Sequence, residues 1–309
     1  MRLQVRPLHP TLAAEVVGVD IAAGVDATTV AELVAASNRY PVLALREQDI
    51  DKEQQVAFAA RFGPLEIAGR NLKEDKFRSR THRHLADISN LDQDGKLLAA
   101  DDRRRLAGLG DRLWHTDSSF KPVPAKYSML YADALPPAGH ATEFADLRAA
   151  YDALSDATRD RVADLVAEHS IARSRSIIGF EYSAEEQAFH PPVRQRVVRF
   201  HPGSHRMTLY LASHASHIVG WPVPEGRSLL LDLIDHSTQP QFVYHHEWRS
   251  GDLVWWDDRC TMHRARPRDS DNIRDMRRAT ICDVASTLAQ YHPTADSRTS
   301  RNLRASLPA

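Results

Sequence analysis

A histidine and an aspartate stand two positions apart in the stretch LWHTDSSF, as His115 and Asp117. In an extended segment, side chains two residues apart point to the same side, so these two could reach one metal ion together. On its own, such a pair is more often a turn in which the aspartate caps nearby amides. The pair becomes informative only if a third ligand lies elsewhere in the chain.

A candidate third ligand follows a late apolar run. In LVWWDDRCTMHRA, His263 comes just after a predicted strand, where two non-adjacent strands of a jelly roll can converge. Two imidazoles and one carboxylate form the facial triad of non-haem iron(II) oxygenases, which leaves three coordination positions open. A structural zinc site would need a fourth protein ligand. A zinc hydrolase using the same three residues would need a general-base glutamate nearby.

Two arginines beyond this histidine, Arg274 and Arg278, lie inside IRDMRRATICD. A guanidinium pairs bidentately with a carboxylate, which is what an oxygenase needs to hold the far end of a dicarboxylate cosubstrate. The neighbouring Arg277 and Arg264 are expected to be surface arginines on a polar connection. A non-catalytic jelly-roll binding protein would need neither the open metal positions nor these arginines.

Short strands are the elements expected to position these side chains, and few helices accompany them. The strand-like segments are 41–45, 84–91, 127–132, a strand running into a helix at 141–154, a hairpin in 193–211, and 241–248, 253–258 and 277–284. Helices are expected after Asp26, after Asp51 with Gln54 as a capping box, after Ser155 with Val162, Leu165 and Val166 on one face, and at 226–236. This pattern predicts a mainly β fold with flanking helices, a sandwich or jelly roll.

The polar segment from Glu66 to Arg112 lacks periodicity apart from one strand-like piece. Inside a compact domain such a connection is usually a lid or a mobile insert, although a solvated loop without a role fits equally. We see no internal repeat and no second domain, so residues 1–309 are interpreted as one domain with a frayed tail from about residue 298.

Composition excludes several classes of partner. Forty basic residues against forty-one acidic ones give a net charge of −1, which offers no general attraction to nucleic acid or to an anionic membrane. No run of about 18 apolar residues and no signal-peptide core occur, so a cytoplasmic protein is predicted. The two cysteines, Cys260 and Cys282, are expected to be buried thiols and cannot form a CxxC zinc site.

Five segments together resemble one enzyme family. They are WHTDSSF, GHATEFADLRAAYDAL, HASHIVGWPVPEGRSLL, FVYHHEWRSGDLVWWDDRCTMHRA and RRATICD. They are similar to the iron(II)/2-oxoglutarate dioxygenases of the taurine dioxygenase family, and within it to the members that oxidise phenoxyacetates, over about Pro7 to Val284. The resemblance implies a double-stranded β-helix (jelly roll), iron(II), 2-oxoglutarate as cosubstrate, O2, and a homo-oligomer.

The resemblance also implies residue roles at the metal and the cosubstrate. His115, Asp117 and His263 would bind iron. Thr142 and Arg274 would hold the two carboxylates of 2-oxoglutarate, and Arg278 would lie beside the cosubstrate and the anionic group of the substrate. Trp256 would wall the iron pocket, although a plain core aromatic is about as well supported at an inward strand position.

For the substrate, the resemblance implies an aryloxyacetate such as 2,4-dichlorophenoxyacetate, a small anionic aromatic compound. Hydroxylation of the carbon next to the ether oxygen would give a hemiacetal that collapses to a phenol and glyoxylate, with succinate and CO2 formed from the cosubstrate. This is a reaction of aromatic catabolism and herbicide degradation. An alkyl sulfate, a sulfonate or a natural aromatic carboxylate is the alternative substrate.

Some residues match or depart from the family on the substrate side. Lys96, His201, His214 and His217 match the phenoxyacetate-oxidising members, but a solvated lysine and hydrogen-bonded structural histidines explain them as well. Ala68 stands where the taurine enzyme has a sulfonate-binding histidine, which argues against taurine. The family's GG-x-T becomes Gly139-His140-Ala141-Thr142, which keeps only the threonine and one glycine.

Overall fold

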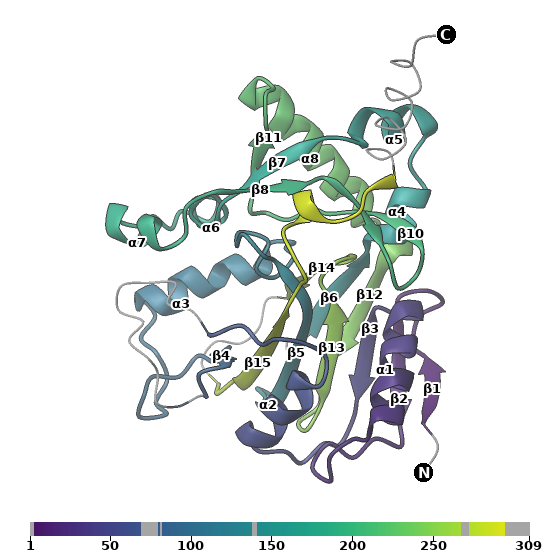
Figure 1. The fold of residues 1–309 in the computed structure, drawn as a ribbon. Helices are drawn as coiled ribbons and strands as arrows, with labels where there is room; N and C mark the ends of the chain where they lie inside the picture. Colours follow the sequence, from purple (N-terminus) through teal and green to yellow (C-terminus); the bar gives the residue numbers. More distant parts are fainter. Residues whose placement is uncertain (1–2, 69–79, 81, 138–140, 267–271, 294–309) are drawn as a thin grey trace.

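Two β-sheets face each other in the computed structural model, which describes residues 3–68, 80, 82–137, 141–266 and 272–293 (Figure 1). The larger sheet has the spatial order β1 (Gln4–Pro7), β2 (Ala13–Val17), β3 (Val42–Leu45), β13 (Leu253–Asp257), β5 (Ala125–Ala134), β15 (Asp275–Cys282) and β4 (Leu85–Asp87). The smaller one has the order β12 (Val243–Glu247), β6 (Ala141–Asp146) and β14 (Thr261–Ala265). Only β2 and β3 pair in parallel among these described strands. This arrangement confirms the predicted jelly roll.

Alternation along the central strand β13 shows how the larger sheet divides the core. Leu253 and Trp255 pack in the apolar cluster under the helices α1 (Ala27–Arg39) and α2 (Lys52–Ala60). Val254 and Trp256 point the other way and pack with Phe144 of the smaller sheet. Successive strand residues face opposite sides, so one β-run supplies both the outer core and the interior between the sheets.

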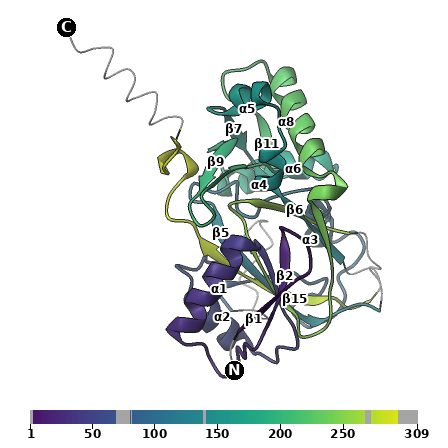
Figure 2. The same cartoon turned by 90° about the vertical axis from the view of Figure 1, so that its right-hand side faces the viewer.

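The helices lie outside the two sheets (Figures 1 and 2). Asp26 caps α1 by accepting from the amide of Thr29, and Asp51 forms the predicted capping box with Gln54 at the start of α2. The other described helices and 3-10 turns are α3 (Arg103–Gly108), η1 (Leu109–Arg112), α4 (Leu147–Asp152), α5 (Asp156–Val162), α6 (Ile171–Ile177), α7 (Ala184–Phe189), α8 (Val223–Ser237), η2 (Pro240–Phe242) and η3 (Thr287–Ala289). In Figure 1, α1 and α2 lie at the lower end, α5 and α8 at the upper end, and α3, α6 and α7 at the left. Helices α4 and α8 pack in a further apolar cluster near β7 (Val166–His169).

The helix predicted after Ser155 is shorter than expected. Ser155 caps α5 as predicted, but the helix ends at Val162, and Val166 begins β7. The spacing of the apolar residues suits a helix, yet Val166 pairs with Arg196 of β8 (Val193–Arg196). Pairing in the small sheet β11 (Ala215–Ile218), β7 and β8 therefore overrides the local pattern. The predicted hairpin is confirmed as β9 (Val198–His201) and β10 (Arg206–Leu209).

The segment from Glu66 to Arg112 is more ordered than a loop where it is described. Its strand β4 pairs antiparallel with β15 at the edge of the larger sheet, and α3 and η1 follow it. An edge strand leaves backbone amides and carbonyls unpaired, so β4 satisfies one side of β15. Residues 69–79 and 81 lie outside the described residues, as does the tail predicted from about residue 298.

Three further predictions are corrected. The described residues of the last third form four strands, because β14 lies between β13 and β15 in the sequence and contains His263, which was expected just after a strand. Arg277 is not a surface residue: it is 5% exposed and donates to Gln55 Oε1 of α2 at 2.8 Å. Cys260 is buried as expected, but Cys282 is half-buried. None of the described helices combines the length and the apolar character needed to cross a bilayer.

Candidate metal centre

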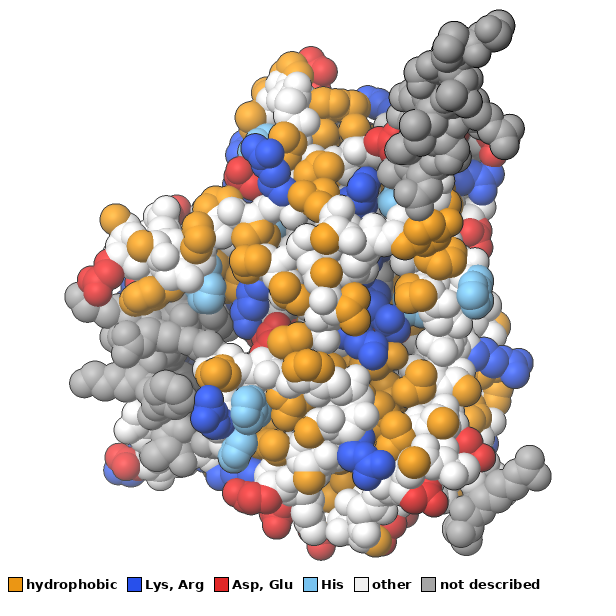
Figure 3. Space-filling model, in the orientation of Figure 1, with side chains coloured by type: hydrophobic (Ala, Val, Ile, Leu, Met, Phe, Trp, Pro, Cys, Tyr) orange, Lys and Arg blue, Asp and Glu red, His pale blue; other side chains and the backbone are white. Residues whose placement is uncertain are grey.

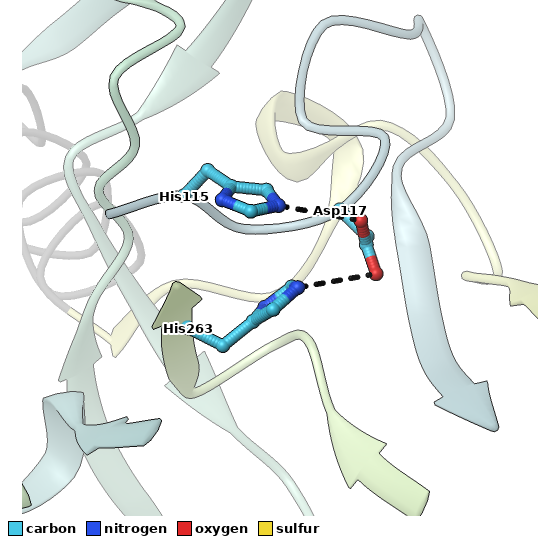
Figure 4. Close-up of side chains that lie close together, drawn as sticks. All are labelled: His115, Asp117 and His263. Carbon is cyan, nitrogen blue, oxygen red and sulfur yellow. Dashed lines mark ion pairs between the residues drawn. The ribbon is translucent and has the colours of Figure 1, made fainter. Parts of the chain in front are cut away.

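His115, Asp117 and His263 point toward one another between the two sheets (Figure 4). His115 Nε2 lies 3.9 Å from Asp117 Oδ1, and His263 Nε2 lies 3.8 Å from Asp117 Oδ2. The three side chains each offer one donor atom, and these atoms all lie within 4.8 Å of one another. All three residues are buried, so water competes little for their lone pairs.

Backbone pairing brings the two histidines together. The amide of His115 donates to the carbonyl of His263 at 3.0 Å, and the amide of His263 donates back at 2.8 Å. This reciprocal pair is the antiparallel arrangement that holds two residues directly opposite each other, and the ring centroids are 4.2 Å apart. The convergence of distant segments predicted from the sequence is therefore a single β-bridge.

Asp117 reaches the centre by a different route from the one predicted. It does not extend a strand with His115 but opens a turn, in which Ser118 has a φ of 52°. The amide of Asp117 donates to Asp258 Oδ1 at 3.1 Å, which fixes the backbone as the chain turns. The spacing of the H-x-D motif was informative, but the extended geometry assumed for it was wrong.

Hydrogen bonding of His115 and burial of His263 prepare the two imidazoles as ligands. His115 Nδ1 lies 2.8 Å from the carbonyl oxygen of Leu113, so Nδ1 carries the proton and Nε2 keeps its lone pair toward Asp117. Burial, followed by the charge of His115, lowers the pKa of His263 well below its ordinary value. A neutral imidazole is the form that binds a metal ion.

Asp117 is held as a carboxylate. Burial would raise its pKa, but the charge of Arg278, followed by His263 and His115, outweighs burial and lowers the pKa to about 2. The guanidinium of Arg278 donates to Oδ1, and Ser128 Oγ donates to Oδ2 at 2.8 Å. An anionic ligand therefore stands ready beside the two imidazoles.

A second buried carboxyl group lies directly behind this ligand and was not singled out from the sequence. Asp258 Oδ1 accepts from both the amide of Asp117 and the indole Nε1 of Trp256, each at 3.1 Å. Burial and the nearby charge of Asp117 raise the pKa of Asp258 well above its ordinary value. Asp258 thus orients a ligand through the backbone. Its only sequence signal was its position at the end of the strand LVWWDD.

Arg274 and Thr142 both lie near Ala265 of β14 in the interior. Arg274 is 6% exposed, its amide donates to Asn90 Oδ1, and its guanidinium donates to the carbonyl of Ile88. It lines a cavity of about 130 Å³ that Ala265 also lines, and Ala265 is the register partner of Thr142 across β14 and β6. Thr142 Oγ1 accepts from Trp248 Nε1 at 2.9 Å.

Strand alternation separates the arginines of this region. Met276 lies in the interior cluster, and Arg278 is two residues further along β15 on the same face, where it reaches Asp117. Arg277 lies on the opposite face and contacts α2. Arg274 and Arg278, which the sequence singled out, are buried and partly buried, whereas Arg277, which was expected at the surface, is buried.

Two aromatic residues border the metal centre. The Trp256 ring centroid lies 4.7 Å from that of His263, and the same ring packs in the interior core, so both interpretations of this residue hold. The His214 ring lies 6.0 Å from His115 and 4.9 Å from Phe120. Burial, followed by the charge of His115, lowers the pKa of His214 well below its ordinary value, so it is neutral.

The remaining substrate-side candidates do not gather at the centre. His201 is fully buried with Nδ1 2.7 Å from Ser204 Oγ and Nε2 3.0 Å from Asp257 Oδ2, so both ring nitrogens already have partners. His217 contacts its neighbour Ser216, and Lys96 is exposed in a turn. Gly139 and His140 lie outside the described residues. The half-buried Ala68 donates from its amide to the carbonyl of Arg83.

An iron(II) ion suits this set of donors. Two imidazole Nε2 atoms and one carboxylate oxygen match the two-histidine, one-carboxylate donor set of non-haem iron oxygenases. The Leu113 carbonyl orients His115, and Ser128 and the turn at Asp117 orient the carboxylate. Such a site leaves coordination positions for a bidentate cosubstrate and for oxygen. Arg274 lines a nearby cavity, and a guanidinium is suited to bind a carboxylate.

Comparison with known proteins agrees with this chemistry. Residues 4–280 match the family described as "Taurine catabolism dioxygenase TauD, TfdA family". The chain is 44% identical over 287 residues to the alpha-ketoglutarate-dependent 2,4-dichlorophenoxyacetate dioxygenase of Cupriavidus pinatubonensis, covering 92% of this chain and 99% of the relative. It is 37% identical over 298 residues to the (S)-phenoxypropionate/alpha-ketoglutarate-dioxygenase of Sphingobium herbicidovorans, covering 93% and 98%. The crystal structure of AAD-2 in complex with Mn(II) and N-oxalylglycine superimposes with a TM-score of 0.86 at 47% identity, covering 94% of this chain and 100% of that one.

Proposed function

Because the chain belongs to the TauD/TfdA family of iron(II)- and 2-oxoglutarate-dependent dioxygenases, we propose that it hydroxylates the carbon next to the ether oxygen of an aryloxyacetate such as 2,4-dichlorophenoxyacetate. The hydroxylated product is a hemiacetal, which collapses to a phenol and glyoxylate without a separate hydrolytic residue. The observation that carries this proposal is the convergence of His115, Asp117 and His263 on one point of the interior.

In this proposal, His115, Asp117 and His263 hold the metal, and Thr142 and Arg274 bind the carboxylates of 2-oxoglutarate. Bound iron(II) with 2-oxoglutarate and O2 supplies the oxidation of a substrate C–H bond, and the cosubstrate becomes succinate and CO2. Burial holds the pKa of His263 well below its ordinary value and the charge of Arg278 holds Asp117 as a carboxylate, so neither of these two ligands has to change its protonation state to bind the metal.

Arg278 has two tasks in this arrangement. Its guanidinium donates to Asp117 Oδ1, which keeps that ligand ionised and oriented. Its positive charge also lies beside the place of the bound dicarboxylate and of the anionic substrate. Trp256, which packs against the His263 ring, keeps water away from one side of the metal centre.

The aromatic ring of the substrate is proposed to lie on the side of the centre bordered by His214 and Phe120. Their rings are 4.9 Å apart and nearly perpendicular, and His214 in turn is close to His115. A neutral imidazole and a phenyl edge suit an aryl ring better than an alkyl sulfate. His201 and the exposed Lys96 have no part in this proposal, because one is fully hydrogen-bonded and the other lies in a solvated turn.

The surroundings of the enzyme are proposed from the sequence. On the face shown in Figure 3, basic, acidic and apolar side chains are interspersed, as expected for a protein that does not bind nucleic acid. A single catalytic domain, the segment 66–112 as a lid, a homo-oligomer and a cytoplasmic location remain predictions. The described part of that segment borders the cavity with Arg274, which supports a role beside the site.

The substrate is tested by measuring succinate and phenol together across a panel of aryloxyacetates, aryloxypropionates, alkyl sulfates and taurine. We expect equal amounts of succinate and phenol with aryloxyacetates, and no product with taurine. The variant Asp117→Ala serves as the blank for non-enzymatic oxidation. Coupled turnover confined to sulfates or sulfonates would overturn the proposed substrate while leaving the cofactors in place.

A further inference from the structure

An arginine that the sequence did not single out packs against the turn leading into the metal centre. Arg175 lies in α6, and its guanidinium lies beside Gly110 of η1, where a Cβ would come within 2.2 Å of NH1. Gly110 therefore leaves the space that the guanidinium occupies. The chain continues from this turn to Leu113, whose carbonyl orients His115.

Helix α6 is tied to the segment that carries His214. The amide of Ser170 donates to the carbonyl of His214 at 2.8 Å, and Ser174 Oγ lies 2.8 Å from Ser213 Oγ. His214 in turn borders His115, with ring centroids 6.0 Å apart. The charge of Arg175 is one of the causes, after burial and His115, of the lowered pKa of His214. Helix α6, which carries Arg175, is therefore held against the segment that borders the metal ligand His115.

The hydrogen bonds of Arg175 are few and long for so buried a group. Its side chain is 12% exposed, and NH2 lies 3.3 Å from Asp111 Oδ1 while NH1 lies 3.4 Å from Ser174 Oγ. Its Nε is buried and has no hydrogen-bond partner among the described residues. By contrast, Arg259 meets both oxygens of Asp257 at 2.8 and 2.6 Å. A desolvated guanidinium with donors to spare is suited to bind an anion.

The partner of Arg175 can be exchanged for a ligand. The side chain of Asp111 is 41% exposed, and it contacts Arg175 through one oxygen only. Asp111 also lines the cavity that Arg274 lines, and its charge is among those that raise the pKa of Arg278. The Arg175–Asp111 pair therefore stands at the border between the cosubstrate cavity and the space beside His214.

We propose that Arg175 binds the carboxylate of the aryloxyacetate and so determines the preference for an anionic substrate. The inference rests on the proposed function. In an aryloxyacetate the carboxylate is attached directly to the carbon that reacts, so its anchor must lie at the edge of the metal centre. Arg278 Nε is also buried without a partner, but its guanidinium is held to the metal ligand Asp117 through NH1, and Lys96 is exposed in a turn. Arg175 has a buried Nε to offer and is not bound to a metal ligand.

The first test compares Arg175→Gln with Arg173→Gln, which removes a charge from the same helix where Arg173 donates to Ser176 Oγ. Loss of a charge-assisted contact should raise the KM for the aryloxyacetate roughly 10- to 100-fold in Arg175→Gln. The KM for 2-oxoglutarate should stay unchanged, and the control should shift by less than about fivefold. A neutral aryloxyethanol should be turned over equally well by wild type and Arg175→Gln.

The second test uses Gly110→Ala, whose new methyl group displaces the guanidinium without touching its charge. The single variant should raise the KM for the aryloxyacetate as Arg175→Gln does, and the double variant should be no worse than either one. A merely structural role would lower the melting temperature of Arg175→Gln and leave the ratio of carboxylate to alcohol turnover unchanged.

The outcomes separate the two proposals. A wild-type enzyme that turns over no aryloxyacetate overturns the proposed function, and the carboxylate anchor with it. An active wild type whose preference for the carboxylate over the alcohol survives in Arg175→Gln overturns the anchor alone. If the increases in KM caused by Gly110→Ala and Arg175→Gln multiply in the double variant, the two substitutions act independently. That result would also contradict the carboxylate anchor.

Discussion

Two buried groups of metal-type side chains lie in the described part of this fold, and they differ in what already occupies their lone pairs. One consists of His115, Asp117 and His263, and the other of His201, Asp257 and Cys260. By residue type and proximity alone both could hold a metal ion. We call them the open cluster and the closed cluster.

In the closed cluster the carboxylate is fully engaged. Arg259 meets both oxygens of Asp257, and His201 Nε2 lies 3.0 Å from Oδ2. Despite burial, the charge of Arg259 and the hydrogen bonds from Arg259 and His201 hold the pKa of Asp257 well below its ordinary value. Burial raises the pKa of the Cys260 thiol well above its ordinary value, so the thiolate that a metal needs does not form.

In the open cluster the cation touches the carboxylate from one side only. Arg278 donates through one nitrogen to Asp117 Oδ1, and the two imidazole Nε2 atoms stay more than hydrogen-bond distance from both carboxylate oxygens. Proximity of ligand-type residues is therefore insufficient to make a metal site. The carboxylate can bind a metal only if an arginine and a histidine do not already occupy both of its oxygens.

The largest expected effect is the loss of a ligand from the open cluster. His263→Ala should lower kcat/KM for any substrate at least about 1000-fold, roughly 4 kcal/mol in the activation barrier, because two ligands cannot hold the metal. Metal content after dialysis and steady-state rates measure this. Retention of stoichiometric metal in the folded variant would break the distinction between the clusters.

Next in size is the disruption of the closed cluster. Asp257→Ala leaves the buried Arg259 guanidinium without its partner, which should lower the free energy of unfolding by about 3–4 kcal/mol. Urea denaturation measures the change. The surviving folded fraction should bind metal with wild-type affinity. A variant that keeps its stability and loses metal would reverse the roles assigned to the clusters.

Loss of a hydrogen bond that orients the ligand Asp117 should have a smaller effect. Ser128→Ala removes the hydroxyl that donates to Asp117 Oδ2 at 2.8 Å, so the affinity for a divalent metal should fall about 10-fold. Isothermal titration with manganese(II) gives the dissociation constant. Thr280→Ala, which changes the register partner of Ser128 on β15, is the matched control and should bind as wild type does.

The pH dependence of stability tests the closed cluster again. Burial lowers the pKa of His201, so the folded state keeps it neutral while the unfolded chain takes up a proton below about pH 6.5. The unfolded state then binds more protons, and stability falls as the pH decreases below 6.5, by up to about 1.4 kcal/mol per pH unit from this group. His201→Gln should remove that part of the slope. An unchanged slope between pH 6.5 and 5 would contradict a neutral His201.

Removal of the thiol from the closed cluster is expected to have no effect on metal binding. Cys260→Ala should leave metal stoichiometry and affinity unchanged, because the thiol of the closed cluster stays protonated. Cobalt(II)-loaded wild type should lack a thiolate-to-cobalt absorption band. Such a band, lost in Cys260→Ala, would show that the closed cluster binds metal.

Residue types and family motifs predicted most residues of the open cluster. The local backbone geometry of the cluster could not be predicted from the sequence. The motif residues His115, Asp117 and His263 do converge, but the bridge between the two histidines and the turn at Asp117 depend on pairing across the chain. Local signals predicted α1, α2 and α8, because α1 and α2 begin with capping side chains and α8 has an apolar face. They failed after Val162, where a long-range strand pairing decides.

The closed cluster shows the same limit. His201 matched the family pattern and was a candidate for the substrate pocket, but its hydrogen bonds to Ser204 and Asp257 engage both ring nitrogens. No local pattern indicates which histidine of a strand has its nitrogens already satisfied. Arg175 and Asp258 were missed for a related reason, since their importance comes from neighbours distant in sequence.

An anaerobic titration of the protein with iron(II) in the presence of 2-oxoglutarate tests the central claim most directly. We predict a weak visible charge-transfer band that saturates at one iron per chain, is unchanged in Cys260→Ala and is absent in folded Asp117→Ala. A correctly folded wild-type protein without the band, or a band of equal strength in Asp117→Ala, would contradict the account.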